Sequence, residues 1–382
     1  MAKFVRYAFP PLFETLQVSY EVSNAALGTA YTGFMLAYAL MQFPSGVLAD
    51  RLGSVKVITG GALLAAIAAL VLVVDSPFFV LAAVMILIGT GTGVHKTVAV
   101  RLLSRMYPQQ TGRALGLLDT FGAFGGVAAP AAVVVAASLP GLFGAEWRTL
   151  FLAAGVVLIG LTIAFAKRAS ARQPEATTSG SHGDTGVGLR QYLELFRGWR
   201  FTVFVAVTVL FSFTYNGVVA FLPLYLGQEA GFGTATVGLL YSALFAVSLI
   251  QLLTGEAGDR LGMLRVITAT LSLATIGLVA LILVTETANL FLVGATVVCI
   301  GIGAHGYRPV RGAYLVTIIP QSMTGGGLGV VRTLLMVAGA ISPGVTGVLS
   351  EIVGFTAAFW LLAGSLALAT ILVIPLLVFS DR

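Results

Sequence analysis

Long apolar runs dominate this sequence, and their length restricts what the chain can fold into. A transmembrane helix needs about 20 consecutive, mostly apolar residues. Eleven segments meet this requirement: 26–48, 55–74, 78–100, 113–138, 147–166, 201–226, 235–254, 264–284, 290–318, 323–349 and 355–379. Only 9% of the 382 residues are charged, against about 25% in soluble domains. The sequence therefore predicts an all-α membrane protein.

A short charged turn between two of these runs occurs twice. It spans residues 46–56 (GVLADRLGSVK) and returns as residues 255–265 (GEAGDRLGMLR), 209 positions later. Both copies keep a glycine, the Asp-Arg pair, a second glycine and a final base in the same order. A repeat at half the chain length, in parallel orientation, indicates two copies of one helical bundle.

The repeated turn carries a family resemblance. It resembles the loop between helices 2 and 3 of the major facilitator superfamily, G-x-x-x-D-R-x-G followed by basic residues, and the second copy resembles the weaker counterpart between helices 8 and 9. Ser54 stands where a base usually follows the second glycine, whereas Lys56 is present. The resemblance implies two pseudo-symmetric six-helix bundles, at 1–168 and 200–382, that form a transporter working by alternating access.

The first helix of the implied twelve is short. Only 18 residues precede the polar stretch 19–24. Pro10 and Pro11 stand where the second half has Pro223 near the end of a long helix, yet fewer than a dozen residues come before them. Helix 1 is therefore expected to begin in mid-membrane, truncated at its N-terminus. A cleaved signal peptide is not expected, because no small-residue cleavage site follows a long apolar core.

Residues 169–199 are predicted to be a cytoplasmic linker between the bundles. Residues 169–187 are rich in small and polar types, which indicates a flexible segment. Residues 189–199 place apolar side chains at helical spacing, which predicts an amphipathic helix on the inner membrane surface.

Basic residues collect in alternate turns between the spans, and this pattern sets the orientation. Cytoplasmic turns are enriched in Lys and Arg. The Asp-Arg turns and the C-terminus are thus predicted to face the cytoplasm, in a multi-pass protein of the cell membrane (the inner membrane of a prokaryote). The net charge of +6 follows from these turns, so no nucleic-acid partner is predicted. The lipid bilayer is the expected surrounding, and we expect a monomer.

No combination of residues indicates an enzyme. The histidines are His95, His182 and His305, and the single cysteine is Cys299. We find no paired-cysteine metal spacing and no phosphate loop, so no catalytic residue, metal or cofactor is predicted. The candidates for function are polar side chains inside the spans, which are costly in lipid and usually face a bundle interior or a water-filled cavity.

Two basic residues occupy matching positions in the halves. Aligning Pro108 with Pro320 sets the offset at 212, which pairs Lys96 with Arg308 and His95 with Tyr307. In family terms these residues lie on helices 4 and 10. We interpret the two bases as a clamp on an anionic substrate, because opposite charges attract strongly in a low dielectric. The alternative is that each base snorkels or pairs with a carboxylate for structural reasons.

A second matched position carries opposite charges. An offset of 213 aligns Pro130 with Pro343 and pairs Asp119 with Arg332, on helices 5 and 11 in family terms. The pair is expected either to form a salt bridge that holds one conformation shut or to bind substrate or a proton. The two roles are compatible if the substrate must break the pair.

Three further residues have two interpretations each. Arg6 lies in a stretch that resembles the end of helix 1 in organic-anion members of the superfamily, where a base can contact substrate; the alternative is a position near the end of a shortened helix. His95 is either a proton carrier near neutral pH or a neutral side chain bonded to a neighbouring helix. His305 has the same two interpretations.

The resemblance also implies a conformational latch. Asp50 would meet the N-terminal end of helix 11 in the other half, where the helix dipole favours an anion. The alternative is a turn that only sets topology. The residues assigned to the latch are Gly46, Asp50, Arg51, Gly53, Lys56, Asp259 and Arg260.

Two departures bear on the substrate. Drug–proton antiporters of the superfamily usually carry an arginine in helix 4, four residues before a glycine, and this chain has Met85 before Gly89. Ala129-Pro130 is followed by Ala-Ala-Val-Val where those proteins have paired glycines. We therefore predict transport of a small organic anion with protons. The alternative is a proton-coupled exporter of drugs or other amphipathic compounds; a channel and a membrane sensor are alternatives of another class.

Overall fold

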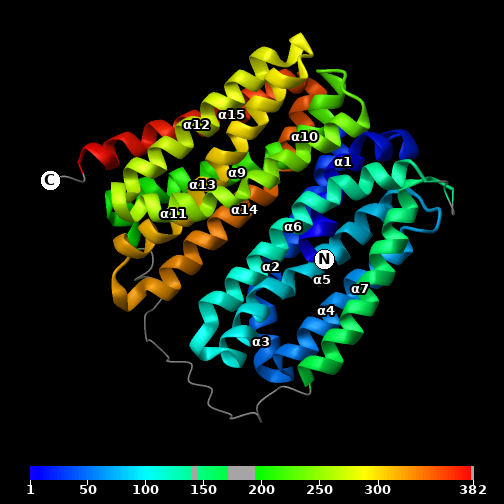
Figure 1. Ribbon diagram of the computed structural model, residues 1–382, viewed down its shortest axis with the longest axis horizontal. Helices are drawn as coiled ribbons and strands as arrows, with labels where there is room; N and C mark the ends of the chain where they lie inside the picture. The colour runs from blue at the N-terminus through cyan, green and yellow to red at the C-terminus, as the bar shows by residue number, and fades with distance from the viewer. Residues whose placement is uncertain (140, 142–143, 171–193, 380–382) are drawn as a thin grey trace. The chain divides into compact units, whose positions relative to one another are not determined.

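The computed structural model describes residues 1–139, 141, 144–170 and 194–379, which form helices and turns with no strand among them (Figure 1). The chain divides into two compact units, Met1–Gly180 and Ser181–Arg382. Most of the predicted linker lies outside the described residues. At its end a 3-10 turn at Leu195–Arg197 leads into a helix that begins at Trp199, in place of the last turn of the predicted amphipathic helix.

The first unit contains seven helical segments in its described residues. They are α1 (Ala2–Tyr20), α2 (Asn24–Leu40), α3 (Gln42–Leu52), α4 (Ser54–Val71), α5 (Phe78–Met106), α6 (Thr111–Ala137) and α7 (Trp147–Ser170). A 3-10 turn, Pro108–Gln110, joins α5 to α6. Helix α1 holds both Pro10 and Pro11 and buries most of its side chains from residue 7 to residue 13.

The second unit repeats this order. Its helices are α9 (Trp199–Gln228), α10 (Thr234–Ala246), α11 (Ile250–Leu261), α12 (Met263–Val284), α13 (Leu290–Ile318), α14 (Thr324–Ile352) and α15 (Phe355–Val378). Short 3-10 turns lie at Val247–Leu249, Thr285–Thr287 and Gln321–Met323. By length and composition, ten described helices can cross a membrane, or eleven when α2 and α3 count as one bent span, which confirms the predicted spans.

The two units share most of their helix pairs, although α9 also packs on α15 whereas the equivalent α1 and α7 barely touch. In the first, α4 packs on α5 and α7, α2 packs on α5, and α1 packs on α6. In the second, α12 packs on α13 and α15, α10 and α11 pack on α13, and α9 packs on α14. The same neighbours at equivalent places confirm the predicted duplication of one bundle.

Glycines bring the central helices of each unit into close contact. A Cβ atom on Gly303 of α13 would lie 2.5 Å from the Thr270 carbonyl oxygen of α12. A Cβ atom on Gly91 of α5, at the equivalent position, would lie 2.5 Å from the Gly61 carbonyl oxygen of α4. Small residues let membrane helices approach this closely. The contact fixes the part of α13 that carries residues 304–311.

The span predicted at 26–48 is not straight. Helices α2 and α3 meet at a 43° bend. Pro44 has no N–H to donate to the Leu40 carbonyl, and its ring clashes with that carbonyl in a regular helix. The Gln42 Nε2 atom donates to the carbonyl oxygens of Tyr38 (3.4 Å) and Gly93 (2.8 Å), and the Gln42 Oε1 atom accepts from Thr97 Oγ1 (2.8 Å). The side chain of Gln42 thus ties the bend to α5.

The second glycine of each Asp-Arg turn has a conformation that other residues avoid. Gly53 ends α3 with φ 89° and ψ 145°, and Gly262 ends α11 with φ 97° and ψ 132°. A Cβ atom is strained in this region, so glycine is the suitable residue. The backbone conformation therefore explains why both copies of the turn keep the second glycine.

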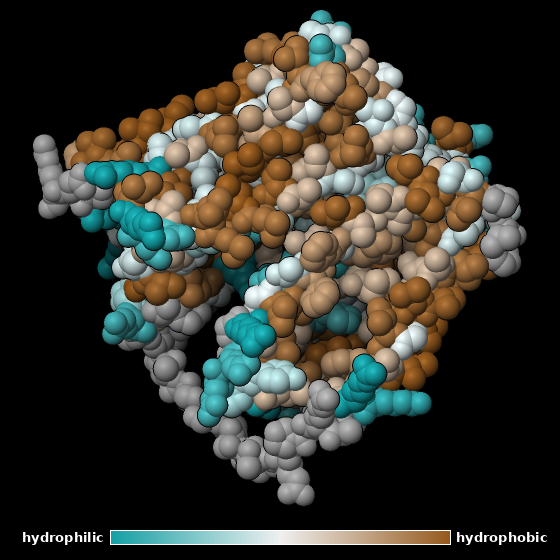
Figure 2. Space-filling view, viewed as in Figure 1, coloured by the Kyte–Doolittle hydropathy of each residue, from teal (hydrophilic) through white to brown (hydrophobic). Residues whose placement is uncertain are grey.

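The exposed surface of the helices is apolar. Figure 2 shows apolar side chains over much of the visible face of each unit. Large hydrophobic residues with more than half of their area exposed include Phe121, Ile276 and Phe291. A water-soluble protein rarely exposes so much contiguous apolar area, whereas helices that face lipid do so.

Candidate functional site

Arg308 is the centre of a polar cluster inside the second unit. It lies on α13, half-buried, with its guanidinium carbon 4.3 Å from the centroid of the Tyr215 ring on α9. One turn earlier, the buried His305 places Nδ1 at 3.5 Å from Arg308 Nη1. The His305 ring lies edge-on to Tyr215 (6.0 Å between centroids) and Phe245 (6.1 Å). Aromatic faces attract cations, so these rings hold the guanidinium in place.

Arg311 follows one turn later on the same helix and is also held by a ring. Its guanidinium carbon lies 5.7 Å from the centroid of Tyr307. The fully buried Tyr307 shares a hydrogen bond with Thr208 of α9, with 3.2 Å between the hydroxyl oxygens, and its ring packs 4.4 Å from that of Phe211. Arg311 was not among the site residues predicted from the sequence. The structure brings it beside Tyr307, one of the predicted site residues.

A third arginine belongs to this cluster. Arg332 lies exposed on α14, and the positive charges of Arg308 and Arg332 both act on Arg311 and oppose its own charge. Arg311 is therefore within electrostatic range of two further cations, one on its own helix and one on α14. The sequence had assigned Arg332, together with Asp119, either to a salt bridge or to binding of substrate or a proton.

Carboxylates do not balance the charges of Arg308 and Arg311 in the part of the second unit that the structure describes. The salt bridge found there joins Arg260 and Glu256 within α11, with 2.5 Å between nitrogen and oxygen. Neither Arg308 nor Arg311 pairs with an acidic side chain among the described residues, and Arg311 Nε is buried there without a hydrogen-bond partner. A buried charge without compensation is costly. The cluster is therefore suited to an anionic ligand.

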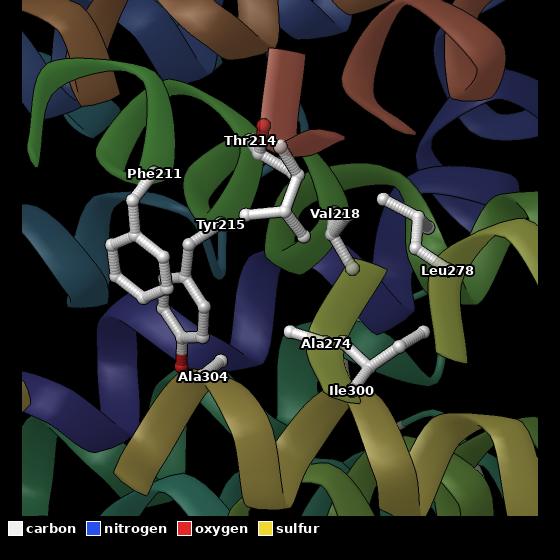
Figure 3. Close-up of a pocket in the computed structure, with 9 residues that line it drawn as sticks. Phe211, Thr214, Tyr215, Val218, Ala274, Leu278, Ile300 and Ala304 are labelled. Atoms are coloured by element: carbon white, nitrogen blue, oxygen red, sulfur yellow. The ribbon is translucent and has the colours of Figure 1, made fainter. Parts of the chain in front are cut away.

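A small hollow adjoins the cluster inside the same unit (Figure 3). Its lining is almost entirely apolar and comes from α9, α12, α13 and α15: Phe211, Thr214, Tyr215, Val218, Ala274, Leu278, Ile300, Ala304 and Leu366. Tyr215 belongs both to this lining and to the ring stack under Arg308. The cluster thus has an apolar wall on the side of Tyr215.

The first unit holds a comparable arginine in α1. The guanidinium carbon of Arg6 lies 5.4 Å from the Tyr7 centroid and 5.7 Å from the Tyr38 centroid. The hydroxyl of the buried Tyr31 donates to the Arg6 carbonyl oxygen (3.1 Å). Arg6 therefore lies half-buried among three tyrosines.

The other predicted site residues of the first unit lie on α5 and α6. Lys96 is exposed, His95 is half-buried and Asp119 is exposed. Lys96 and Asp119 belong to the first unit, whereas Arg308 and Arg332 belong to the second. The Lys96–Arg308 clamp and the Asp119–Arg332 gate therefore stay predictions.

The Asp-Arg turns differ in their ion pairs. In the first unit Asp50 forms a salt bridge with Arg101, near the end of α5. In the second, Arg260 pairs with Glu256 of its own helix, and Asp259 is exposed. Arg51 and Lys56 are exposed. Sequence reasoning missed the Asp50–Arg101 pair, and the clustering of Arg101 and Arg105 just after a span was the available signal.

Comparisons with known proteins agree with the fold and the helix pairs. The family model described as Major Facilitator Superfamily matches residues 1–307 and 236–382. A bacterial homologue of the human lysosomal transporter Spinster, in an inward-facing unoccupied conformation, superposes with a TM-score of 0.79 at 17% identity, covering 98% of this chain and 92% of that one. A D-xylose–proton symporter superposes with a TM-score of 0.78 at 15% identity, covering 97% and 95%.

Curated relatives are transporters. A probable sulfoacetate transporter of Cupriavidus necator is 26% identical over 254 residues, which is 63% of this chain and 56% of that protein. A gentisate transporter of Corynebacterium glutamicum is 25% identical, covering 87% of this chain and 75% of that protein. The chain thus spans little more than half the length of the first relative. It belongs to the Major Facilitator Superfamily, and its apolar helices are those of a multi-pass membrane protein.

Proposed function

We propose that this transporter moves a small organic anion by alternating access of its two bundles. The observation that carries the proposal is the pair Arg308 and Arg311, two half-buried cations held by tyrosine rings without a carboxylate partner among the described residues. The names of the sulfoacetate and gentisate transporters support the same substrate class.

The cost of the uncompensated charge explains why an anion is the suitable ligand. An arginine near the centre of a bilayer costs about 2.5–3.5 kcal/mol on insertion scales. Two arginines one turn apart on α13 also repel each other. A bound anion removes both penalties, whereas a cation adds to them. A cationic drug is therefore a poor ligand for this cluster.

The remaining site residues have supporting roles in this proposal. Lys96, from the matched position in the first unit, supplies a second cationic group to the anion, and Arg6 and Tyr307 contribute to the lining. Asp119 and Arg332 form the gate that the anion opens. His95 is the candidate for the proton that accompanies the anion.

The Asp-Arg turn serves as the latch. Asp50, fixed by Arg101 in the first unit, would face the N-terminal end of the helix-11 equivalent, α14, in the state closed to the cytoplasm. Arg51, Lys56, Asp259 and Arg260 complete the charges at that surface. The domain boundaries at 168 and 200, a cytoplasmic C-terminus, a monomeric state and a place in the cell membrane belong to the same proposal.

Uptake by purified protein in liposomes tests the function. A labelled organic anion, sulfoacetate or gentisate, is expected to enter faster when an inward proton gradient is imposed. Arg308→Ala should reduce the gradient-driven part most and Lys96→Ala less, while Arg265→Ala, at an exposed cation of α12, should leave it intact.

Two results would contradict the proposal. One is flux that does not saturate with anion concentration, which is the behaviour of a channel. The other is thermal stabilisation of the protein by cationic drugs alone, unchanged in Arg308→Ala and Lys96→Ala, which favours the exporter alternative.

A further inference from the structure

Arg308 and Arg311 lie on one face of α13. Residues three apart on a helix are neighbours, with Cβ atoms about 5–6 Å apart. Each of the two guanidinium groups lies over its own tyrosine ring, at 4.3 Å for Arg308 and 5.7 Å for Arg311. The rings come from different helices, Tyr215 from α9 and Tyr307 from α13. The two cations are therefore held separately and do not share one binding point.

The rings leave the hydrogen-bonding edges of these arginines available. A guanidinium is planar and carries its N–H donors in the plane, so a ring over one face leaves the edges for a carboxylate or sulfonate. In the described residues, Arg311 Nε is buried without a hydrogen-bond partner, and neither arginine has a carboxylate. Arg308 Nη1 lies 3.5 Å from His305 Nδ1, and its remaining N–H groups are not used by that contact. Each arginine therefore keeps donors that can bind one acidic group.

The charge of the cluster favours two acidic groups over one. A single carboxylate at Arg308 would leave the charge of Arg311 uncompensated. A ligand with two acidic groups a few bonds apart pairs with both arginines at once. The second contact is then made without a second loss of translational freedom.

We propose that the substrate of this site is a small dianion whose two acidic groups bind Arg308 and Arg311 separately. The inference rests on the proposed anion transport and names its substrate class. His305, beside Arg308, and Tyr215 and Phe211, next to the apolar hollow, limit the space around the first group. The carbon skeleton that joins the acidic groups is therefore short.

Matched ligands test the inference directly. Acetate and methanesulfonate carry one acidic group, and malonate and sulfoacetate carry two on a similar skeleton. Dissociation constants from thermal shifts of the purified chain, at fixed ionic strength and neutral pH, are expected to be at least about tenfold lower for the dianions. Arg311→Gln is expected to remove this ratio while acetate binding stays within about threefold, because Arg308 still binds the single group.

Further variants separate the possible outcomes. Arg308→Gln should weaken both ligand sets, and Arg265→Gln, an exposed cation of α12, should weaken neither. If Arg311→Gln does not fold, Arg311→Lys takes its place and should lower the ratio about threefold, because the charge stays but the planar fork is lost.

Equal affinities for the two ligand sets, or an unchanged ratio in the Arg311 variants, would overturn the dianion assignment and leave anion transport standing. Failure of every anion to stabilise the wild-type protein would instead overturn the proposed function.

Discussion

The α4–α5 contact of the first unit and the α12–α13 contact of the second are equivalent. The glycine and the branched residue at this contact, however, lie on opposite helices in the two units. In the first, Gly61 of α4 faces Val94 of α5, and a Cβ atom on Gly61 would lie 2.2 Å from Val94 Cγ2. In the second, Thr270 stands at the position of Gly61, and Gly306 stands at that of Val94, with 3.0 Å between Thr270 Cγ2 and a Cβ atom built on Gly306. The glycine of this pair therefore lies on α4 in the first unit and on α13 in the second.

This exchange shows what the duplicated bundle preserves. Close-packed interiors tolerate substitution when the total volume is kept. Each unit keeps one small and one branched residue at the contact, but on opposite helices. In the second unit the glycine therefore lies on α13, between His305 and Tyr307, so that α13 carries both the close contact and the arginine cluster.

The largest expected effect tests this exchange. Gly61→Thr should destabilise the first unit at the upper end of the about 1–3 kcal/mol typical of overpacking, because its side chain meets both Val94 and the Gly91 carbonyl oxygen. The double variant Gly61→Thr with Val94→Gly reproduces the second unit and should recover part of that loss. Thermal unfolding in detergent measures both. A double variant no better than the single one would show that the two contacts are not equivalent.

Ligand binding gives the next largest difference between the units. Arg308→Ala should weaken anion binding about 10–100-fold, because it removes a charge-assisted, forked contact. Lys96→Ala removes a single point charge and should weaken binding by about tenfold or less. Titration of the thermal shift with malonate compares them. A larger loss for Lys96→Ala would move the main anion contact to the first unit.

The Asp-Arg turns should respond equally where their backbones agree. Gly53→Ala and Gly262→Ala each place a Cβ atom at a φ near +90°, at φ 89° and 97°, which costs about 1–3 kcal/mol. Similar falls in melting temperature are expected. An unequal pair of shifts would show that the surroundings of one turn, and not its dihedral angles, determine the need for glycine.

Substitutions in the ion pairs of the Asp-Arg turns should change stability least, and the change should differ between the two units. Asp50 and Arg101 are each about one-third exposed, so their pair contributes on the order of 0.2–1 kcal/mol. Asp50→Asn and Arg101→Gln should lower stability by similar, non-additive amounts, whereas Asp259→Asn should have little effect. A double-mutant cycle measures the coupling. Additive losses would indicate that the two residues act independently.

The sequence predicted the parts of this fold that depend on the bilayer and on the backbone. The spans follow from the length needed to cross lipid. The second glycine of each Asp-Arg turn appears in both copies of the sequence because the backbone has a positive φ there. The equivalence of Lys96 and Arg308 followed from the repeat. None of these needs knowledge of which face of a helix meets its neighbour.

Side-chain partners were harder to predict for a physical reason. Helices that are apolar all round give no periodicity that fixes their rotation about the axis. Arg311 was therefore not among the predicted site residues. The partner of Asp50 was expected in the other half, whereas the structure pairs Asp50 with Arg101 of the same unit. Pro44 indicated the bend at Met41, but the span was predicted from its hydropathy, which does not reveal a bend.

The bend between α2 and α3 has a consequence for the surroundings of the chain. Hydrocarbon cannot hydrate a peptide carbonyl, so an interrupted helix inside a bilayer normally attracts water to its exposed oxygens. The Gln42 amide covers the Tyr38 and Gly93 oxygens, while Gln251 at the equivalent place binds the Ser248 oxygen of its own segment. The Gln42 carboxamide thus binds one carbonyl oxygen beside the bend and one on α5, which fastens the bent span to the neighbouring helix.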